Sequence, residues 1–183
     1  MEINTNTHTG PSFSLKNRCL RALWSIAYTL LFRPSPRIAH TWRTWLLRSF
    51  GARLGKNCHI YPKAIVWAPW NLVCDDEVGV ADDVILYNQA PITLGYRVVI
   101  SQRSHLCTGT HDYNDPGFPL IAKPISIGAK AWIAAESFIH PAVVVGEGCV
   151  VGARSVVINS LPPWKVCTGN PCAPIKDRKR HER

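Results

Sequence analysis

A single histidine follows a short run of small and apolar residues and precedes a polar stretch in the segment "LCTGTHDYNDPGFP", Leu106 to Pro119. A neutral imidazole accepts a proton near neutral pH, so His111 is a candidate general base, and it is also a candidate metal ligand. Asp112 follows directly and is a candidate to orient the ring. The elements that position this histidine decide between these roles.

The seven cysteines offer a second kind of chemistry, but their number is odd and no two of them form a CxxC pair. This argues against a disulfide framework or a structural zinc site and indicates a reducing compartment, so we expect a cytoplasmic protein. Residues 1–14 are polar, and the most apolar segment, residues 20–32, is shorter than a membrane span. We therefore expect neither a signal peptide nor a transmembrane helix.

The totals favour one globular domain: the chain has 183 residues, of which 46% are hydrophobic. The formal net charge of +9 suits anionic partners such as nucleotide-like cofactors, acidic sugars or membrane headgroups. The basic residues form no arm interleaved with aromatic residues, so nucleic acid is not the expected partner.

An aliphatic residue returns every six positions through most of the chain. The series is Leu54, Ile60, Val66, Leu72, Val78 and Val84, then Leu94, Ile100 and Leu106, then Ile127, Ile133, Ile139, Val145, Val151 and Val157. A period of six is typical of neither a helix nor a simple strand, but of a triangular β-solenoid in which each unit is one short strand and a corner. The spacing predicts an all-β solenoid of about five coils, residues 54–71, 72–89, 94–111, 127–144 and 145–162.

Several segments of the chain are similar to the hexapeptide-repeat acyltransferases, and among them to the colanic acid biosynthesis acetyltransferases. They include "IYPKAIVWAPWNL" (60–72), "HDYNDPGFPL" (111–120), "WIAAESFI" (132–139) and "GNPCAPI" (169–175). The resemblance covers about residues 13–178; galactoside and maltose acetyltransferases are more distant relatives. It implies a left-handed parallel β-helix, an exception to the usual crossover hand.

The resemblance also implies roles for individual residues. His111 is then the general base on the acceptor hydroxyl, and Asn88, with Tyr87 and Asp112, lies at the acceptor; the repeat phase places Gln89 one coil below His111. Coenzyme A is expected between two subunits of a homotrimer, at Trp132, Ala134, Ala135, Gly152, Ala153, Ile158, Asn159 and Lys176. Small side chains would let backbone groups meet the pantetheine arm, although any solenoid corner also prefers them.

Together with the repeat and His111, the resemblance implies an acetyl-CoA-dependent O-acetyltransferase that needs no metal and acetylates a sugar or glycolipid hydroxyl in exopolysaccharide or cell-surface glycan biosynthesis. One alternative is a xenobiotic acetyltransferase. Another is a zinc enzyme of the carbonic anhydrase type built from His105, His111 and His140 at a subunit interface. A third is a solenoid that only binds a partner.

The segments outside the repeats have separate predictions. Residues 1–14 form a flexible N-terminus, and residues 15–53 a helical segment broken by "RPSPR" at 33–37. This segment either caps the open end of the solenoid or, with its tryptophans and arginines, contacts the inner face of the cytoplasmic membrane. Both predictions hold if one face of the segment packs on the solenoid and the other contacts lipid. Residues 112–126 form one long loop, and residues 163–183 a C-terminal turn and a basic tail.

Overall fold

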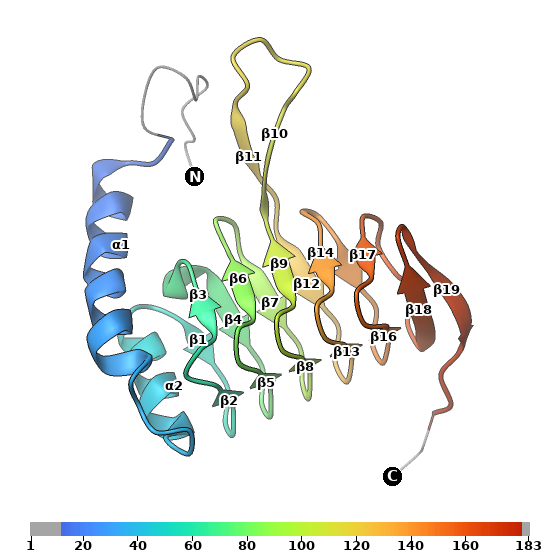
Figure 1. The fold of residues 1–183 in the computed structure, drawn as a ribbon, viewed down its shortest axis with the longest axis horizontal. Coiled ribbons are helices and arrows are strands. Elements are labelled where there is room, and N and C mark those ends of the chain that lie inside the picture. Colours follow the sequence, from blue (N-terminus) through green and yellow to red (C-terminus); the bar gives the residue numbers. More distant parts are fainter. Residues whose placement is uncertain (1–11, 181–183) are drawn as a thin grey trace.

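The six-residue repeat folds into a parallel β-solenoid with three faces, each of them one sheet in which the strands of successive coils run parallel (Figure 1). The structure is a computed structural model and describes residues 12–180. The predicted fold class is confirmed. Because each unit is one short strand and a corner, successive units fall on successive faces, and the aliphatic residue of each unit points into the core.

The strands divide among the faces in order along the chain. The first sheet contains β1 (Arg53–Leu54), β4 (Leu72–Cys74), β7 (Ile92–Leu94), β12 (Ile125–Ile127) and β15 (Val144–Val145). The second sheet contains β2 (His59–Ile60), β5 (Gly79–Val80), β8 (Val99–Ile100), β13 (Trp132–Ile133), β16 (Val150–Val151), β18 (Lys165–Gly169) and β19 (Cys172–Asp177). The third sheet contains β3 (Ile65–Val66), β6 (Ile85–Tyr87), β9 (His105–Cys107), β14 (Phe138–Ile139) and β17 (Val156–Val157).

The number of coils and the register of the second coil differ from the prediction. Leu161 bridges to Val145 and β18 pairs with β16, so the solenoid has about six turns instead of five. In the first coils the pairing is Leu54 with Cys74 and Val66 with Leu86, which makes each coil two residues longer than the predicted eighteen.

The extra residues lie in the corner after the third sheet, where the first coil forms a 3-10 turn, Pro69–Asn71. The prediction went wrong because Val78 and Val84 continue the period of six. In the structure they stack instead on Cys58 and Ala64 of the coil before, which are small buried residues two positions before the aliphatic residues of the repeat. A buried valine also fits there.

The predicted loop of residues 112–126 is largely a β-hairpin. Strand β10 (Gly109–His111) pairs antiparallel with β11 (Leu120–Ala122), and Ile125 already belongs to the next coil. The hairpin projects from the side of the solenoid, as the yellow strands of Figure 1 show. The predicted C-terminal turn is likewise the antiparallel pair β18–β19, while residues 181–183 lie outside the described residues.

The N-terminal segment covers the first coil with two helices, α1 (Leu15–Ala27) and α2 (His40–Ser49), separated by a π-helical turn, Tyr28–Phe32. Residues 1–11 of the predicted flexible N-terminus lie outside the described residues, whereas Phe13 packs on Trp67 with ring centroids 5.1 Å apart. The buried face of the segment includes Trp24, Phe32 and Leu47, which join the solenoid core.

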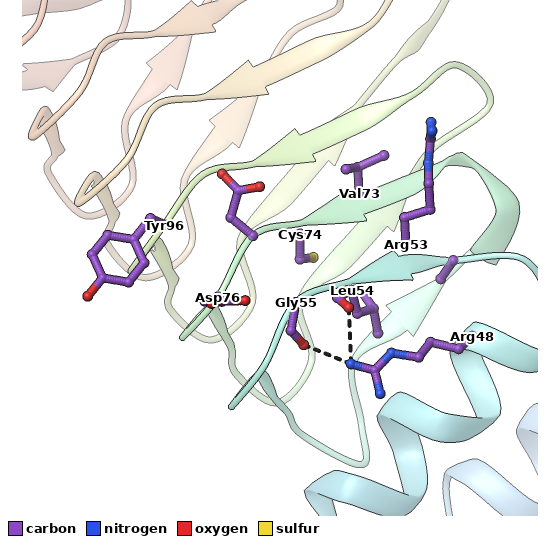
Figure 2. Close-up of a pocket in the computed structure, with 10 residues that line it drawn as sticks. Arg48, Arg53, Leu54, Gly55, Val73, Cys74, Asp76 and Tyr96 are labelled. Atoms are coloured by element: carbon purple, nitrogen blue, oxygen red, sulfur yellow. Dashed lines mark hydrogen bonds between the residues drawn. The ribbon is translucent and has the colours of Figure 1, made fainter.

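This cover supplies hydrogen-bond donors to the open edge of all three sheets. Strand N–H groups donate to the following coil, so the carbonyls of the first coil have no coil before them. The side chains of three N-terminal residues donate to these carbonyls: Trp24 to Val66 O at 2.7 Å, Arg43 to Ile60 O at 2.6 Å, and Arg48 to Leu54 O at 3.0 Å. Figure 2 shows the Arg48 bonds as dashed lines. The segment is therefore a cap that continues the hydrogen-bond ladder with side chains.

Within residues 12–180, no helix is both long and apolar enough to cross a membrane.

Candidate active site

His111 lies at the end of β10, on the hairpin rather than on a solenoid coil. Its Nδ1 atom is 3.0 Å from the Phe118 carbonyl oxygen, and its ring stacks on the Phe118 ring with centroids 4.3 Å and planes 11° apart. The chain returns at β11, where His111 pairs with Leu120, and this return brings Phe118 over the imidazole. The hairpin therefore holds the half-buried imidazole from two sides.

The carbonyl contact determines which ring nitrogen is basic. A carbonyl oxygen only accepts hydrogen bonds, so the bond exists when Nδ1 carries the proton. In the neutral ring Nε2 then carries the lone pair and is the atom that can accept a proton from a substrate. Phe118 was not among the predicted site residues, and no sequence signal marked it, because its contact depends on how the hairpin closes.

Tyr87 and Asn88 lie at the corner below the base of the hairpin. The N–H of Thr108 donates to Tyr87 O at 3.1 Å, which joins this corner to the start of β10. The side chain of Asn88 is fully buried: its Oδ1 accepts from Ala68 N at 2.9 Å and its Nδ2 donates to Ala68 O at 2.7 Å. Asn88 thus ties two coils together, a role that the sequence did not predict, and its contact with an acceptor stays a prediction.

The longer coils also move Gln89 away from the position predicted for it. Gln89 lies beneath Gly109, where an added Cβ would clash with its Oε1, and not beneath His111. Its Nε2 donates to the Tyr87 hydroxyl at 2.8 Å. Gly109 is therefore required for the close approach of the hairpin base to the coil below.

Asp112 contributes to the shape of the loop. Its carboxylate accepts from Asn114 N at 3.0 Å, and its own N–H donates to Pro119 O at 3.1 Å. Such Asx turns are a common local use of aspartate. Within residues 12–180, no hydrogen bond joins the Asp112 carboxylate to the imidazole of His111, so the ring is oriented by Phe118 instead.

Most of the predicted cofactor residues stack along one edge of the solenoid. Ala134 and Ala135 follow β13, and Gly152 and Ala153 follow β16, so both pairs occupy the corner between the second and third sheets in neighbouring coils. Ala153 is exposed. Trp132 begins this strip; its ring is 46% exposed and its Nε1 donates to Ser101 Oγ at 2.9 Å, a partner that the prediction did not include.

The remaining predicted cofactor residues lie elsewhere. Ile158 and Asn159 follow β17 and are exposed at the opposite edge of the third sheet, the edge from which the hairpin also leaves. Lys176 is exposed on β19. A single chain therefore does not bring His111 together with the Ala135 and Ala153 strip, because the third sheet separates them.

Positive charge borders the strip of small residues. Arg154 donates from Nε to Glu136 Oε2 at 2.7 Å, and Arg103 reaches the other carboxylate oxygen at 3.4 Å. The bond from Arg154, more than that from Arg103, lowers the pKa of Glu136 from its ordinary value. Two guanidinium groups against one carboxylate leave this edge with a net positive charge, which suits an anionic ligand.

The other histidines of the repeat pack with aromatic rings on the third sheet. The His105 ring makes edge contacts with Tyr87 and Phe138, and His140 makes one with Phe138. Burial lowers the pKa of His105. Among the described residues, no group of three or more His, Cys, Asp or Glu side chains is arranged to hold a metal ion, so one chain does not form the zinc site of the alternative prediction.

A cavity of about 820 Å³ lies at the capped end of the first sheet, away from the hairpin (Figure 2). Arg48, Arg53, Asp76 and Tyr96 are among its lining residues. The one thiol that lines it, Cys74, is buried, and burial raises its pKa well above the ordinary value. The cavity contains no imidazole or hydroxyl of a serine or threonine, so we do not regard it as the reaction centre.

Comparison with known proteins adds to this geometry. No family model matches the chain. The chain is 46% identical over 160 residues to the colanic acid biosynthesis acetyltransferase WcaF of Escherichia coli (strain K12), covering 87% of this chain and 88% of that protein.

Two solved structures have the same fold. A maltose O-acetyltransferase from Clostridium difficile 630 superposes with a TM-score of 0.82 at 23% identity, covering 91% of this chain and 90% of that one. A hexapeptide-repeat acetyltransferase from Vibrio cholerae O1 biovar eltor, complexed with acetyl coenzyme A, gives a TM-score of 0.81 at 26% identity and covers 93% of both chains. The chain belongs to the family of hexapeptide-repeat acetyltransferases, and it is an enzyme of that class.

Proposed function

We propose that the protein transfers the acetyl group of acetyl-CoA to a hydroxyl of a sugar or glycolipid in exopolysaccharide or cell-surface glycan biosynthesis, with His111 as the general base. The observation that carries this proposal is the bond between His111 Nδ1 and the Phe118 carbonyl, because it leaves Nε2 as the basic atom. The name of the WcaF relative supports the glycan pathway.

The reaction requires little machinery. Nε2 accepts the proton of the acceptor hydroxyl while its oxygen attacks the thioester carbonyl. The tetrahedral intermediate then expels the coenzyme A sulfur, and the imidazolium returns the proton to that thiolate. The Phe118 carbonyl stabilises the imidazolium between the two steps, since its oxygen accepts the Nδ1 proton in both charge states of the ring.

We also propose that the active site forms between subunits of a homotrimer. The support is the separation within one chain: His111 leaves one edge of the third sheet, whereas the small residues expected at the pantetheine arm lie on the other edge. A cyclic assembly places the hairpin of one copy beside the strip of the next.

The remaining predicted residues have roles in the same assembly. Ile158 and Asn159, on the hairpin's own edge, would contact the same cofactor from the first copy. Tyr87 and Asp112 remain the proposed acceptor contacts. We further propose that the reaction takes place in the cytoplasm, since the free cysteines suit a reducing compartment. We also propose that it requires no metal, because an imidazole base is enough to activate a hydroxyl.

The test is acetyl transfer from acetyl-CoA to a panel of nucleotide sugars, free sugars, lipid-linked oligosaccharides and hydroxyl-bearing antibiotics. We expect transfer to a sugar or lipid-linked sugar. His111→Ala should lower kcat by a factor of about 100 to 10,000, the usual contribution of a general base, while calorimetry shows unchanged coenzyme A binding. Full activity of this variant would refute the assignment of the base, and exclusive transfer to antibiotics would favour the xenobiotic alternative.

A further inference from the structure

The outer surface of the N-terminal cap is apolar, although it faces away from the solenoid. On α1 the side chains of Leu23 and Ile26 are each 58% exposed, and Leu30 in the π-helical turn is 66% exposed. Residues at positions i, i+3 and i+7 lie on one side of a helix, so these three form a stripe. The opposite side of α1 carries Trp24, which is buried against the solenoid.

Two tryptophans extend this stripe onto α2. Trp42 and Trp45 are 40% and 55% exposed, and their rings stack with centroids 5.2 Å apart. Trp42 Nε1 donates to Leu31 O at 2.9 Å, which fixes the pair against the end of the π-helical turn. Together Leu23, Ile26, Leu30, Leu31, Trp42 and Trp45 form what we term the outer apolar face.

The charged residues of the capping segment all have one sign. Residues 12–53 contain eight Lys and Arg residues and no Asp or Glu. Of these, Lys16, Arg18 and Arg33 are exposed on or next to α1. Exposed apolar side chains, interfacial tryptophans and flanking cations without carboxylates are the combination that binds an anionic bilayer surface.

We propose that the outer apolar face docks on an anionic lipid bilayer, with the apolar side chains among the headgroups and the cations at the lipid phosphates. A second copy of this chain is the less suitable occupant, because a twofold contact would set these cations against one another with no carboxylate in the segment to neutralise them. The proposal does not depend on the reaction that the enzyme performs.

The position of the cap gives this docking a geometry. Helix α1 lies across one end of the solenoid, opposite the end formed by β18 and β19, and the β10–β11 hairpin projects from the side (Figure 1). Contact through α1 therefore leaves the hairpin and the strip of small residues uncovered. Such docking would hold the enzyme beside acceptors that are themselves attached to lipid.

The test is co-sedimentation of the full chain with vesicles of phosphatidylcholine, with and without phosphatidylglycerol. We expect binding that requires phosphatidylglycerol and weakens at high salt. The double variant Leu23→Glu/Ile26→Glu should weaken the binding constant for the vesicles about tenfold or more, because the surface that the two side chains together still expose contributes at least that factor when it is buried. Both side chains point outward, so the thermal unfolding midpoint of the variant should stay near that of the wild type.

Ile175→Glu is the matched control, since Ile175 is 60% exposed on β19 at the other end of the solenoid, and it should bind as the wild type does. Failure of the wild type to bind anionic vesicles would overturn the proposal, and so would an equal loss in the control. A double variant that keeps its vesicle binding but shows a smaller mass by light scattering would also overturn it, because the face would then join copies of the chain. The double variant changes no residue of the proposed active site, so its activity on soluble sugars should match that of the wild type when it binds no vesicles and keeps its mass. This test therefore stands apart from that of the proposed reaction.

Discussion

Arg43 allows the clearest test of how the cap holds the solenoid. Its guanidinium has no exposed surface and lies between α2 and the first coil. It donates to the carbonyl oxygens of Ile60, Pro36 and Arg37 at 2.6, 2.7 and 2.7 Å and to Ser35 Oγ at 2.9 Å. Arg43→Met keeps most of the volume and removes every donor.

The expected loss follows from these four bonds. Hydrogen bonds from a charged group contribute about 1.5 to 3 kcal/mol each, so the four together contribute about 6 to 12 kcal/mol. Burying the guanidinium costs several kcal/mol, and burial is also what lowers its pKa. We therefore expect Arg43→Met to lower the free energy of unfolding by about 3 to 5 kcal/mol.

Urea unfolding followed by tryptophan fluorescence measures this difference. Arg48→Met is the matched control, because Arg48 also donates to two carbonyls of the first coil but is exposed, so water replaces its bonds and the loss should stay below about 1 kcal/mol. If the two variants lose the same free energy of unfolding, burial of the guanidinium does not increase the contribution of its hydrogen bonds to stability, and the explanation is wrong.

Three further predictions concern the cofactor edge, pH and the thiols. Ala153→Phe should raise the KM for acetyl-CoA about tenfold or more with a smaller effect on kcat, since the ring fills the proposed pantetheine path; an unchanged KM would remove Ala153 from the site. Burial lowers the pKa of His105, so the unfolded chain binds the proton first, and stability should fall as the pH drops below about 6.5, the ordinary histidine value. His105→Phe should reduce this fall, and urea unfolding at neutral and acidic pH measures it; an identical pH dependence in the variant would contradict the assignment. Burial raises the pKa of Cys149 to about 12, whereas Cys19 is exposed, so a maleimide should label Cys19 in the native protein and Cys149 only after unfolding. Mass spectrometry locates the label, and early labelling of Cys149 would show that its coil opens readily.

The repeat was readable from the sequence because a buried aliphatic stripe is a local pattern. The register of the second coil was not, since Val78 and Val80 both fit the core and only the pairing of Val80 with Ile60 distinguishes them. The helices of the N-terminal segment were expected from their apolar spacing, and a cap on the open end of the solenoid was one of the two roles predicted for them. Its hydrogen bonds to the carbonyls of the first coil could not be predicted, because Arg43 reads as a surface residue until the edge that it covers is known.

The candidate site was likewise predictable from the sequence only in part. His111 was identified by its place before the loop and by the resemblance of its neighbours. Its orientation depends on Phe118, which reaches the imidazole only because the hairpin returns along β10. The bonds of Asn88 to the coil before could not be predicted, because a buried amide that ties two coils and one that binds a substrate look alike in a sequence.

The stacking of the coils has a consequence for how the molecule opens. Each coil pairs only with the coil before and the coil after it, so fraying begins at an end and proceeds coil by coil. Two helices close the N-terminal end, whereas the single hairpin β18–β19 closes the other, and this should be the end that opens first. Ala135 and Ala153 lie in the coils next to that weaker end. A cofactor bound there would stabilise the closed state of the last coils. The amide protons of these coils should therefore exchange with water more slowly as the occupancy of the site rises.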